Sequence, residues 1–205
     1  MVNAPSKKRG EMSRELPILY STPMVQTILA GRKDMTRRVI NTEIACNYDG
    51  GPVFEDGNGD LHPIESYARY QPGDLLWVKE GIARVPRMFD TASGYHTEAV
   101  YAADNTPVVG VNWVWKHDSL PGMFMPKSCA RLWLSVESVR AERLQDITGE
   151  DAVREGCPGE YRYNHPVETS CKQFQILWDS INGKAHPWDS NPWVWVYGFR
   201  RIEHA

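Results

Sequence analysis

Two segments in the second half of the chain alternate between apolar and polar residues, and they limit the fold more than any other feature. Arg131–Val139 places Leu132, Leu134 and Val136 on one face, as a half-buried strand does. Asn191–Ile202 alternates in the same way and is rich in aromatic and β-branched residues. Because no regular alternation of strands with helices accompanies them, the sequence predicts an α+β fold. The expected architecture is a small, partly closed, mixed β-barrel that is flanked by short helices.

A cationic segment follows the first predicted helix, which spans residues 24–30 and ends at Gly31. If the chain then runs extended, Thr36 and Arg38 share one face, and Lys33 leans over it from the turn. A threonine hydroxyl attacks a carbonyl when a base takes its proton, and a lysine amine can be that base. The segment therefore indicates acyl transfer. The alternative is a solvated basic turn that interacts favourably with the helix dipole.

A glutamate at the end of a second short helix is the next candidate. Thr148 and Asp151 have the spacing of an N-cap and an acidic third helical position, and Gly156 ends the helix. Glu155 therefore lies at the helix C-terminus, where the dipole disfavours a carboxylate by about 0.3–1 kcal/mol. A carboxylate kept against this penalty indicates another role. A third helix is expected over about residues 168–181, with its apolar face in the core.

Composition describes an ordinary globular chain of 205 residues with a net charge of -3 at pH 7. It has no apolar run approaching the roughly 18 residues of a membrane span and no apolar leader, so a cytoplasmic protein without membrane contact is expected. The small negative net charge does not favour electrostatic binding of duplex nucleic acid. Cys157, His165 and Cys171 fit no usual zinc spacing, so neither metal nor cofactor is expected, and the four cysteines are expected to be reduced.

Domain organisation follows from where regular patterns stop. Residues 1–15 are expected to form a flexible tail and residues 16–205 a single domain. Two long loop insertions are expected, at about residues 41–70 and 81–126, because these stretches are irregular in pattern. Within the second, Glu98–Ala102 is the one segment that looks like a strand, and its scattered aromatic residues indicate a lid or a substrate wall.

Four segments together resemble the ASCH domain, a member of the PUA-like superfold, in the form found in phages and prophages. The segments are Leu29-Ala-Gly-Arg-Lys-Asp-Met-Thr-Arg-Arg, Gly73-Asp-Leu-Leu-Trp-Val, the stretch from Arg143 to Gly156, and Trp193-Val-Trp-Val with Phe199. Their order agrees with the family over almost the whole chain. The same set is similar to the compact bacterial ASCH enzymes that hydrolyse the amide of N(4)-acetylcytidine.

This resemblance implies residue roles. The Gly-Arg-Lys-x-x-Thr-x-Arg motif of those enzymes is matched by Gly31, Arg32, Lys33, Thr36 and Arg38. It implies a catalytic set of Lys33, Thr36 and Glu155, with no metal. Arg38 would support this set and, with Gly31 and Arg32, would bind the substrate. Apart from the resemblance, Trp77 is expected to stack a base, although a strand tryptophan is more often a packing residue. Asp34 departs from the motif and puts a negative charge beside the proposed base.

The sequence thus leads to one expected activity and two rivals. The expected activity is metal-independent removal of an acyl group from the exocyclic nitrogen of N(4)-acetylcytidine or a related modified nucleoside. One rival is a noncatalytic module that binds RNA or a modified base, because a fold does not fix a function. The other is a phage ribonuclease that uses the same cationic pocket, with Lys33 and Arg38 at phosphate. The acyl group, the choice between nucleoside and RNA, and the oligomeric state stay open.

Overall fold

A central sheet of five strands organises the protein in the computed structural model, which describes residues 13–41, 45–46, 52–55, 58–90, 95–162 and 165–203. Its strands lie in the order β1 (Glu15–Leu19), β6 (Leu75–Lys79), β10 (Trp133–Arg143), β13 (Trp193–Ile202) and β2 (Met35–Val39). β1 runs parallel to β6, and the other neighbours are antiparallel. Most of the predicted N-terminal tail, residues 1–12, lies outside the described residues.

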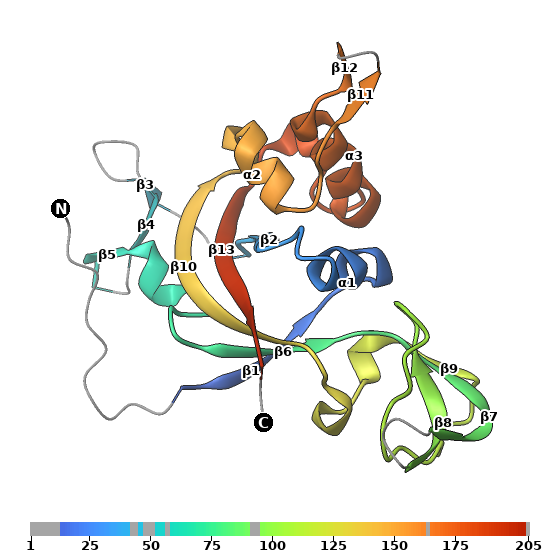
Figure 1. The fold of residues 1–205 in the computed structure, drawn as a ribbon. Coiled ribbons are helices and arrows are strands. Elements are labelled where there is room, and N and C mark those ends of the chain that lie inside the picture. Colours follow the sequence, from blue (N-terminus) through green and yellow to red (C-terminus); the bar gives the residue numbers. More distant parts are fainter. Residues whose placement is uncertain are drawn as a thin grey trace.

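The sheet is curved but open. β10 and β13 are the longest strands of this sheet and bend together through the middle of the molecule (Figure 1). Their pairing shifts register between Val136 and Ser138, and such bulges bend a strand. β1 and β2 end the strand order, and no pairing joins them within the described residues. The α+β class is confirmed, and the barrel, which was predicted to be partly closed, is not closed by strand pairing in the described residues.

Three short α-helices flank the sheet, as the patterns predict. They are α1 (Thr22–Leu29), α2 (Gly149–Arg154) and α3 (Ser170–Asn182). The Thr148 hydroxyl accepts a hydrogen bond of 3.1 Å from the Asp151 N–H, which is the expected N-cap of α2. Short 3-10 turns connect the elements: η1 (Ile64–Tyr67), η2 (Gly122–Phe124), η3 (Lys127–Cys129), η4 (Leu144–Asp146) and η5 (Trp188–Ser190). No described helix is long and apolar enough to cross a bilayer.

Two apolar cores lie on opposite faces of the sheet, and β13 contributes to both by alternation. Its aromatic residues face the core that α1 covers, and its valines face the core that α2 and α3 cover. The first core includes Val25, Ile28, Leu132, Leu134, Trp195, Tyr197 and Phe199. The second includes Met35, Leu144, Ala152, Phe174, Trp178, Val194 and Val196. The candidate site lies where β2 and the end of α2 come together between these cores.

The two predicted loop insertions are folded β-structures, which corrects the prediction. The first contains β3 (Ala45–Cys46), β4 (Pro52–Glu55) and β5 (Leu61–Pro63) in one sheet. The second pairs β7 (Ile82–Asp90) with β8 (Tyr95–Tyr101) and β9 (Ser119–Leu120), over a core of its own. Pro86 conceals β7 in the sequence, because proline weakens a strand pattern. The structure accommodates it by a register shift between Arg84 and Met88.

A buried ion pair fastens this second unit to the main sheet. Arg131 donates to both oxygens of Glu80 at 2.9 Å, and it also binds Asp104 at 2.8 Å. Its guanidinium lies 3.8 Å from the centroid of the Tyr101 ring. A further hairpin, β11 (Glu160–Arg162) with β12 (His165–Glu168), lies between α2 and α3 in the chain.

Candidate active site

The turn between α1 and β2 places the predicted lysine. Gly31 has φ +67°, a left-handed conformation that glycine adopts without strain, and its N–H bonds the Ile28 carbonyl at 3.0 Å. The Arg32 N–H bonds the Thr27 carbonyl at 2.9 Å, which closes the helix end. The chain then turns inward, so that Lys33 is buried before β2 begins at Met35.

Lys33 and Glu155, two residues of the predicted catalytic set, form a buried ion pair. Lys33 Nζ lies 2.6 Å from Glu155 Oε2 and also donates to the Glu155 backbone carbonyl at 3.0 Å. The two side chains are 0% and 2% exposed, so water does not screen the pair. Gly156, at φ +94°, ends α2 directly behind Glu155 and lets the chain turn away. The helix dipole disfavours the Glu155 carboxylate at the end of α2, and the Lys33 ammonium from the turn after α1 offsets this penalty.

Arg37 is a central residue of this site, although the predicted catalytic and substrate-binding residues do not include it. One guanidinium nitrogen lies 3.2 Å from Glu155 Oε1, and the other lies 2.5 Å from Glu142 and 2.8 Å from Asp151. Burial alone would lower the pKa of Arg37, but the three carboxylates outweigh it and raise the pKa above its ordinary value. Arg140 also binds Glu142 and Asp151.

The cluster of Lys33, Arg37, Arg140, Glu142, Asp151 and Glu155 therefore contains three cations and three anions. Equal numbers keep the buried charges compensated, which a low-dielectric site requires. Arg37 alternates with Thr36 along β2 and so faces α2 and α3, with its guanidinium 5.6 Å from the Phe174 ring. An arginine between two apolar residues of a strand, Met35 and Val39, is the sequence signal that could have identified it.

Thr36 and Arg38 stand on the opposite face of β2, as their spacing predicts. They lie in register with Tyr197 and Trp195 of β13. Thr36 is 1% exposed and lies beside Tyr20, whose pKa is raised by burial, an effect that Arg38 and Thr36 oppose. Lys33 Nζ lies 5.9 Å from the centroid of the Tyr20 ring. The fold thus gathers Lys33, Thr36 and Glu155 around one buried tyrosine.

Asp34 lies apart from the proposed base. Its carboxylate accepts a hydrogen bond of 2.9 Å from Arg154, and both side chains are substantially exposed. The backbone of Asp34 also bonds Arg154 and Phe199, which fixes the start of β2 between α2 and β13. The negative charge that departs from the motif is therefore compensated on the surface, outside the Lys33–Glu155 pair.

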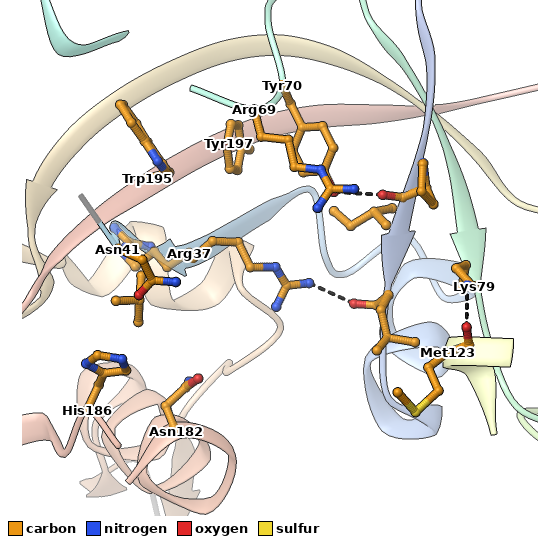
Figure 2. A pocket seen from close by; sticks show the side chains of 15 residues that line it. Arg37, Asn41, Arg69, Tyr70, Lys79, Met123, Asn182, His186, Trp195 and Tyr197 are labelled. Atoms are coloured by element: carbon orange, nitrogen blue, oxygen red, sulfur yellow. Dashed lines mark hydrogen bonds between the residues drawn. The ribbon is translucent and has the colours of Figure 1, made fainter. Parts of the chain in front are cut away.

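An open cavity of about 680 Å³ adjoins this cluster. Figure 2 shows Arg69, Tyr70 and Tyr197 gathered at one side of it, with Asn182 and His186 on another side. The lining residues are Pro17, Ile18, Leu19, Arg37, Arg38, Val39, Asn41, Arg69, Tyr70, Lys79, Met123, Asn182, His186, Trp195 and Tyr197. None of these is acidic. The cavity therefore combines positive charge with aromatic surface.

Three cations of the cavity have no carboxylate partner within the described part of the chain. Arg38 donates to the Leu19 carbonyl at 2.8 Å and lies 5.2 Å from the Tyr20 ring. Arg69 lies over the Tyr70 ring at 5.4 Å, and Lys79 donates to the Met123 carbonyl. Backbone carbonyls and ring faces leave the positive charges uncancelled, in contrast to Arg37. The cavity is consequently attractive to an anionic ligand.

The predicted substrate-binding residues do not share one place. Arg38 lines the large cavity, whereas Gly31 and Arg32 line a separate hollow of about 260 Å³ beside Arg154. Trp77 lines neither, and its ring lies 5.6 Å from the Lys79 ammonium. The sequence spacing groups Gly31, Arg32 and Arg38 together, but the turn after α1 sends them to different surfaces.

Cys157 lies next to the ion cluster and is buried. Burial first, and then the charge of Glu155, raise the pKa of this thiol to about 11, while Lys33 opposes them. Within the described residues, no group of three or more His, Cys, Asp or Glu side chains is arranged to hold a metal ion.

Fold and site together define a mixed α+β domain with a curved open sheet, a buried ion cluster and an adjoining cationic cavity. No protein-family model matches the chain, and no curated protein sequence matches it. The chain is similar to the ASCH domain from Lactobacillus crispatus JV V101, with 11% identity, a TM-score of 0.43, and coverage of 93% of this chain and 81% of that one. It is also similar to a protein of the DUF984 family from Enterococcus faecalis V583, with 6% identity, a TM-score of 0.41, and coverage of 94% and 82%.

Proposed function

We propose that the chain is an ASCH-type amidohydrolase, which removes an acyl group from the exocyclic nitrogen of N(4)-acetylcytidine or a related modified nucleoside. The observation that carries the proposal is the Lys33–Glu155 pair. These residues are 122 positions apart in sequence, yet they meet at 2.6 Å in a buried place beside Thr36. Charged side chains that are buried and paired beside a cavity are typical of functional sites. The motif resemblance over residues 29–38 supports the same assignment.

The chemistry begins with a proton transfer. Lys33 takes a proton from the Thr36 hydroxyl, or from a water bound at that hydroxyl, and the oxygen forms a bond to the acyl carbonyl carbon. The carbonyl π electrons move to oxygen and give a tetrahedral oxyanion. When the intermediate collapses, the bond between the acyl carbon and the exocyclic nitrogen breaks. The nitrogen receives a proton relayed through Lys33 and Glu155, and cytidine leaves with a free amino group. When Thr36 is the nucleophile, a water then attacks the acyl-threonine ester, the bond between the acyl carbon and the Thr36 oxygen breaks, and Thr36 regains its proton as the carboxylic acid leaves. When water is the nucleophile, the same collapse releases the carboxylic acid directly.

Lys33 must lose its proton before it can act as a base, and Glu155 is the acceptor within reach. Proton transfer across the 2.6 Å contact gives a neutral amine and a neutral carboxyl group. Arg37 opposes this step because its charge favours the carboxylate, but Glu142 and Asp151 share that charge. No hydrogen bond joins Lys33 to Thr36 among the described contacts. Catalytic hydrogen bonds of this kind often form once substrate is bound.

The cavity supplies a place for the nucleoside. Tyr70, Tyr197 and Trp195 contribute an aromatic wall to the cavity, against which a pyrimidine can pack. Arg38 reaches from the cavity wall to the Tyr20 ring and so connects the nucleoside place with the buried cluster. The acyl group is the part of the substrate that must approach Thr36.

The experiment is release of cytidine from N(4)-acetylcytidine by the purified chain, with and without a chelator. Lys33→Met and Glu155→Gln preserve much of the side-chain volume, Thr36→Ala removes the hydroxyl, and each variant is expected to lower kcat by at least about 10²-fold. Thr36→Ser retains the hydroxyl that either nucleophile requires and should retain turnover. Arg154→Gln, which breaks the exposed pair with Asp34, is the matched control and keeps wild-type turnover.

Absence of turnover by folded wild-type protein refutes the proposal. So does a Glu155→Gln protein that is folded and fully active. Retained activity in the chelator, together with loss in all three site variants, supports it.

A second function, binding of RNA or a modified base without catalysis, is favoured by the uncompensated cations Arg38, Arg69 and Lys79. For this function Arg38→Gln and Arg69→Gln weaken binding of a single-stranded oligonucleotide, and affinity falls steeply with added salt. Lys33→Met leaves that affinity within about twofold. Cleavage of the oligonucleotide during the measurement would instead indicate the ribonuclease.

A further inference from the structure

One buried side-chain polar atom in the described residues lacks a hydrogen-bond partner. It is the hydroxyl oxygen of Tyr20, whose side chain is almost wholly buried at 2% exposure. The great majority of buried polar groups in native proteins are hydrogen-bonded, so an unpaired one requires an explanation. Other buried tyrosines of this chain follow the rule, since Tyr70 donates to Pro17 and Tyr101 donates to Cys129.

Tyr20 lies among the residues that would carry out the proposed reaction. Tyr20 directly follows β1, and the Arg38 guanidinium that binds the preceding Leu19 carbonyl lies 5.2 Å from its ring. Lys33 Nζ lies 5.9 Å from the same ring, and Thr36 is beside the hydroxyl. Burial raises the pKa of Tyr20 well above its usual value, although Arg38 and Thr36 oppose this effect. The phenol is therefore a neutral hydrogen-bond donor throughout the neutral range.

We infer that the Tyr20 hydroxyl donates a hydrogen bond to the carbonyl oxygen of the bound acyl group and to the oxyanion that forms from it. This inference rests on the proposed function. An unpaired donor beside the nucleophile is suited to this task, because it need not first break a bond within the protein. The bond strengthens as negative charge develops on the oxygen, so it contributes more to the transition state than to substrate binding.

Tyr20→Phe tests the inference, because it removes one oxygen atom and retains the ring. We expect kcat for N(4)-acetylcytidine to fall by about 10²-fold, while KM changes by less than about threefold. The midpoint of thermal unfolding should stay the same or rise, since the variant removes an unpaired buried hydroxyl.

Tyr101→Phe is the matched control. It removes a buried hydroxyl that is already paired, 2.9 Å from the Cys129 carbonyl, in the separate core of the β7–β8–β9 unit. Its unfolding midpoint should fall and its kcat should stay at the wild-type value. Tyr20→Phe is therefore expected to lose activity without losing stability, and Tyr101→Phe to lose stability without losing activity.

The outcomes separate the two hypotheses. If the wild-type chain does not turn over the substrate, the proposed function fails, and the role of Tyr20 fails with it. If the wild-type chain is active and Tyr20→Phe retains its kcat, only the role of Tyr20 is refuted. If Tyr20→Phe lowers both kcat and the midpoint of thermal unfolding, the role of Tyr20 is also refuted, because the hydroxyl would then be structural.

Discussion

Replacing Glu155 by glutamine should destabilise the protein far more than replacing its partner Lys33 by methionine. In Glu155→Gln the Lys33 ammonium stays buried, with a 0% exposed side chain, and loses its counter-ion at 2.6 Å. Removing one partner of a buried pair in this way costs about 3–5 kcal/mol. In Lys33→Met, Glu155 retains Arg37 at 3.2 Å, so the expected cost is about 1–3 kcal/mol.

The double variant, Lys33→Met with Glu155→Gln, tests the same buried pair. With both charges removed, Arg37 retains Glu142 and Asp151, and no buried ion is left without a partner. Replacing both members of a buried pair by residues of similar volume is often nearly neutral. The double variant should therefore be more stable than Glu155→Gln alone, and the coupling energy should be at least about 2 kcal/mol.

Urea unfolding at pH 7, followed by tryptophan fluorescence, measures these free energies, provided that a second probe gives the same transition. In thermal unfolding the Glu155→Gln midpoint should fall by roughly 6–20 °C. Arg154→Gln is the control for an exposed pair and should cost less than about 1 kcal/mol. Additive single effects, or equal effects of the two single variants, would refute the buried-pair reasoning.

Two further predictions concern other groups. Cys157, with a pKa raised to about 11 by burial and by Glu155, should react with iodoacetamide at pH 8 more slowly than the half-buried Cys171, and faster labelling of Cys157 in peptide mass spectra would contradict this. Burial would raise the pKa of Asp104, but hydrogen bonds from Arg131 and Thr106 outweigh it and lower the pKa below the ordinary 3.8. The stabilisation from this carboxylate is therefore present above about pH 4 and lost as pH falls through the lower folded-state pKa. Arg131→Met should remove that part of the acid dependence in pH-dependent urea unfolding, and an unchanged profile would refute it.

Local patterns predicted much of the fold. The alternation of residues 131–139 and 191–202 identified β10 and β13, the longest strands of the central sheet. Thr148 and Gly156 marked the two ends of α2, because capping depends on neighbouring residues alone. In the insertions, the strand predicted at Glu98–Ala102 corresponds to β8, but the other strands were not predicted. These other strands are short or interrupted by Pro86, and pairing with a distant strand overrides a weak local pattern.

The candidate site was predicted only in part, because local patterns do not specify which distant residues meet. Motif spacing named Lys33, Thr36 and Glu155, and the structure gathers them around Tyr20. Trp77, named as a ring that could stack a base, lines neither cavity, and Arg37 was not among the predicted site residues. A strand pattern states which residues share a face, but it does not state what lies opposite that face.

The sequence by itself determined the elements of this protein: the strand faces, the helix ends and the residue types available for acyl chemistry. These depend on interactions within a few residues, which the order of the chain specifies directly. Tertiary structure alone decided which charges meet. Arg37 and Glu142 are 105 positions apart, and Lys33 and Glu155 are 122 apart. Their burial, their compensation and the unpaired hydroxyl of Tyr20 arise when the end of α2 packs beside β2, because only then does water leave these groups.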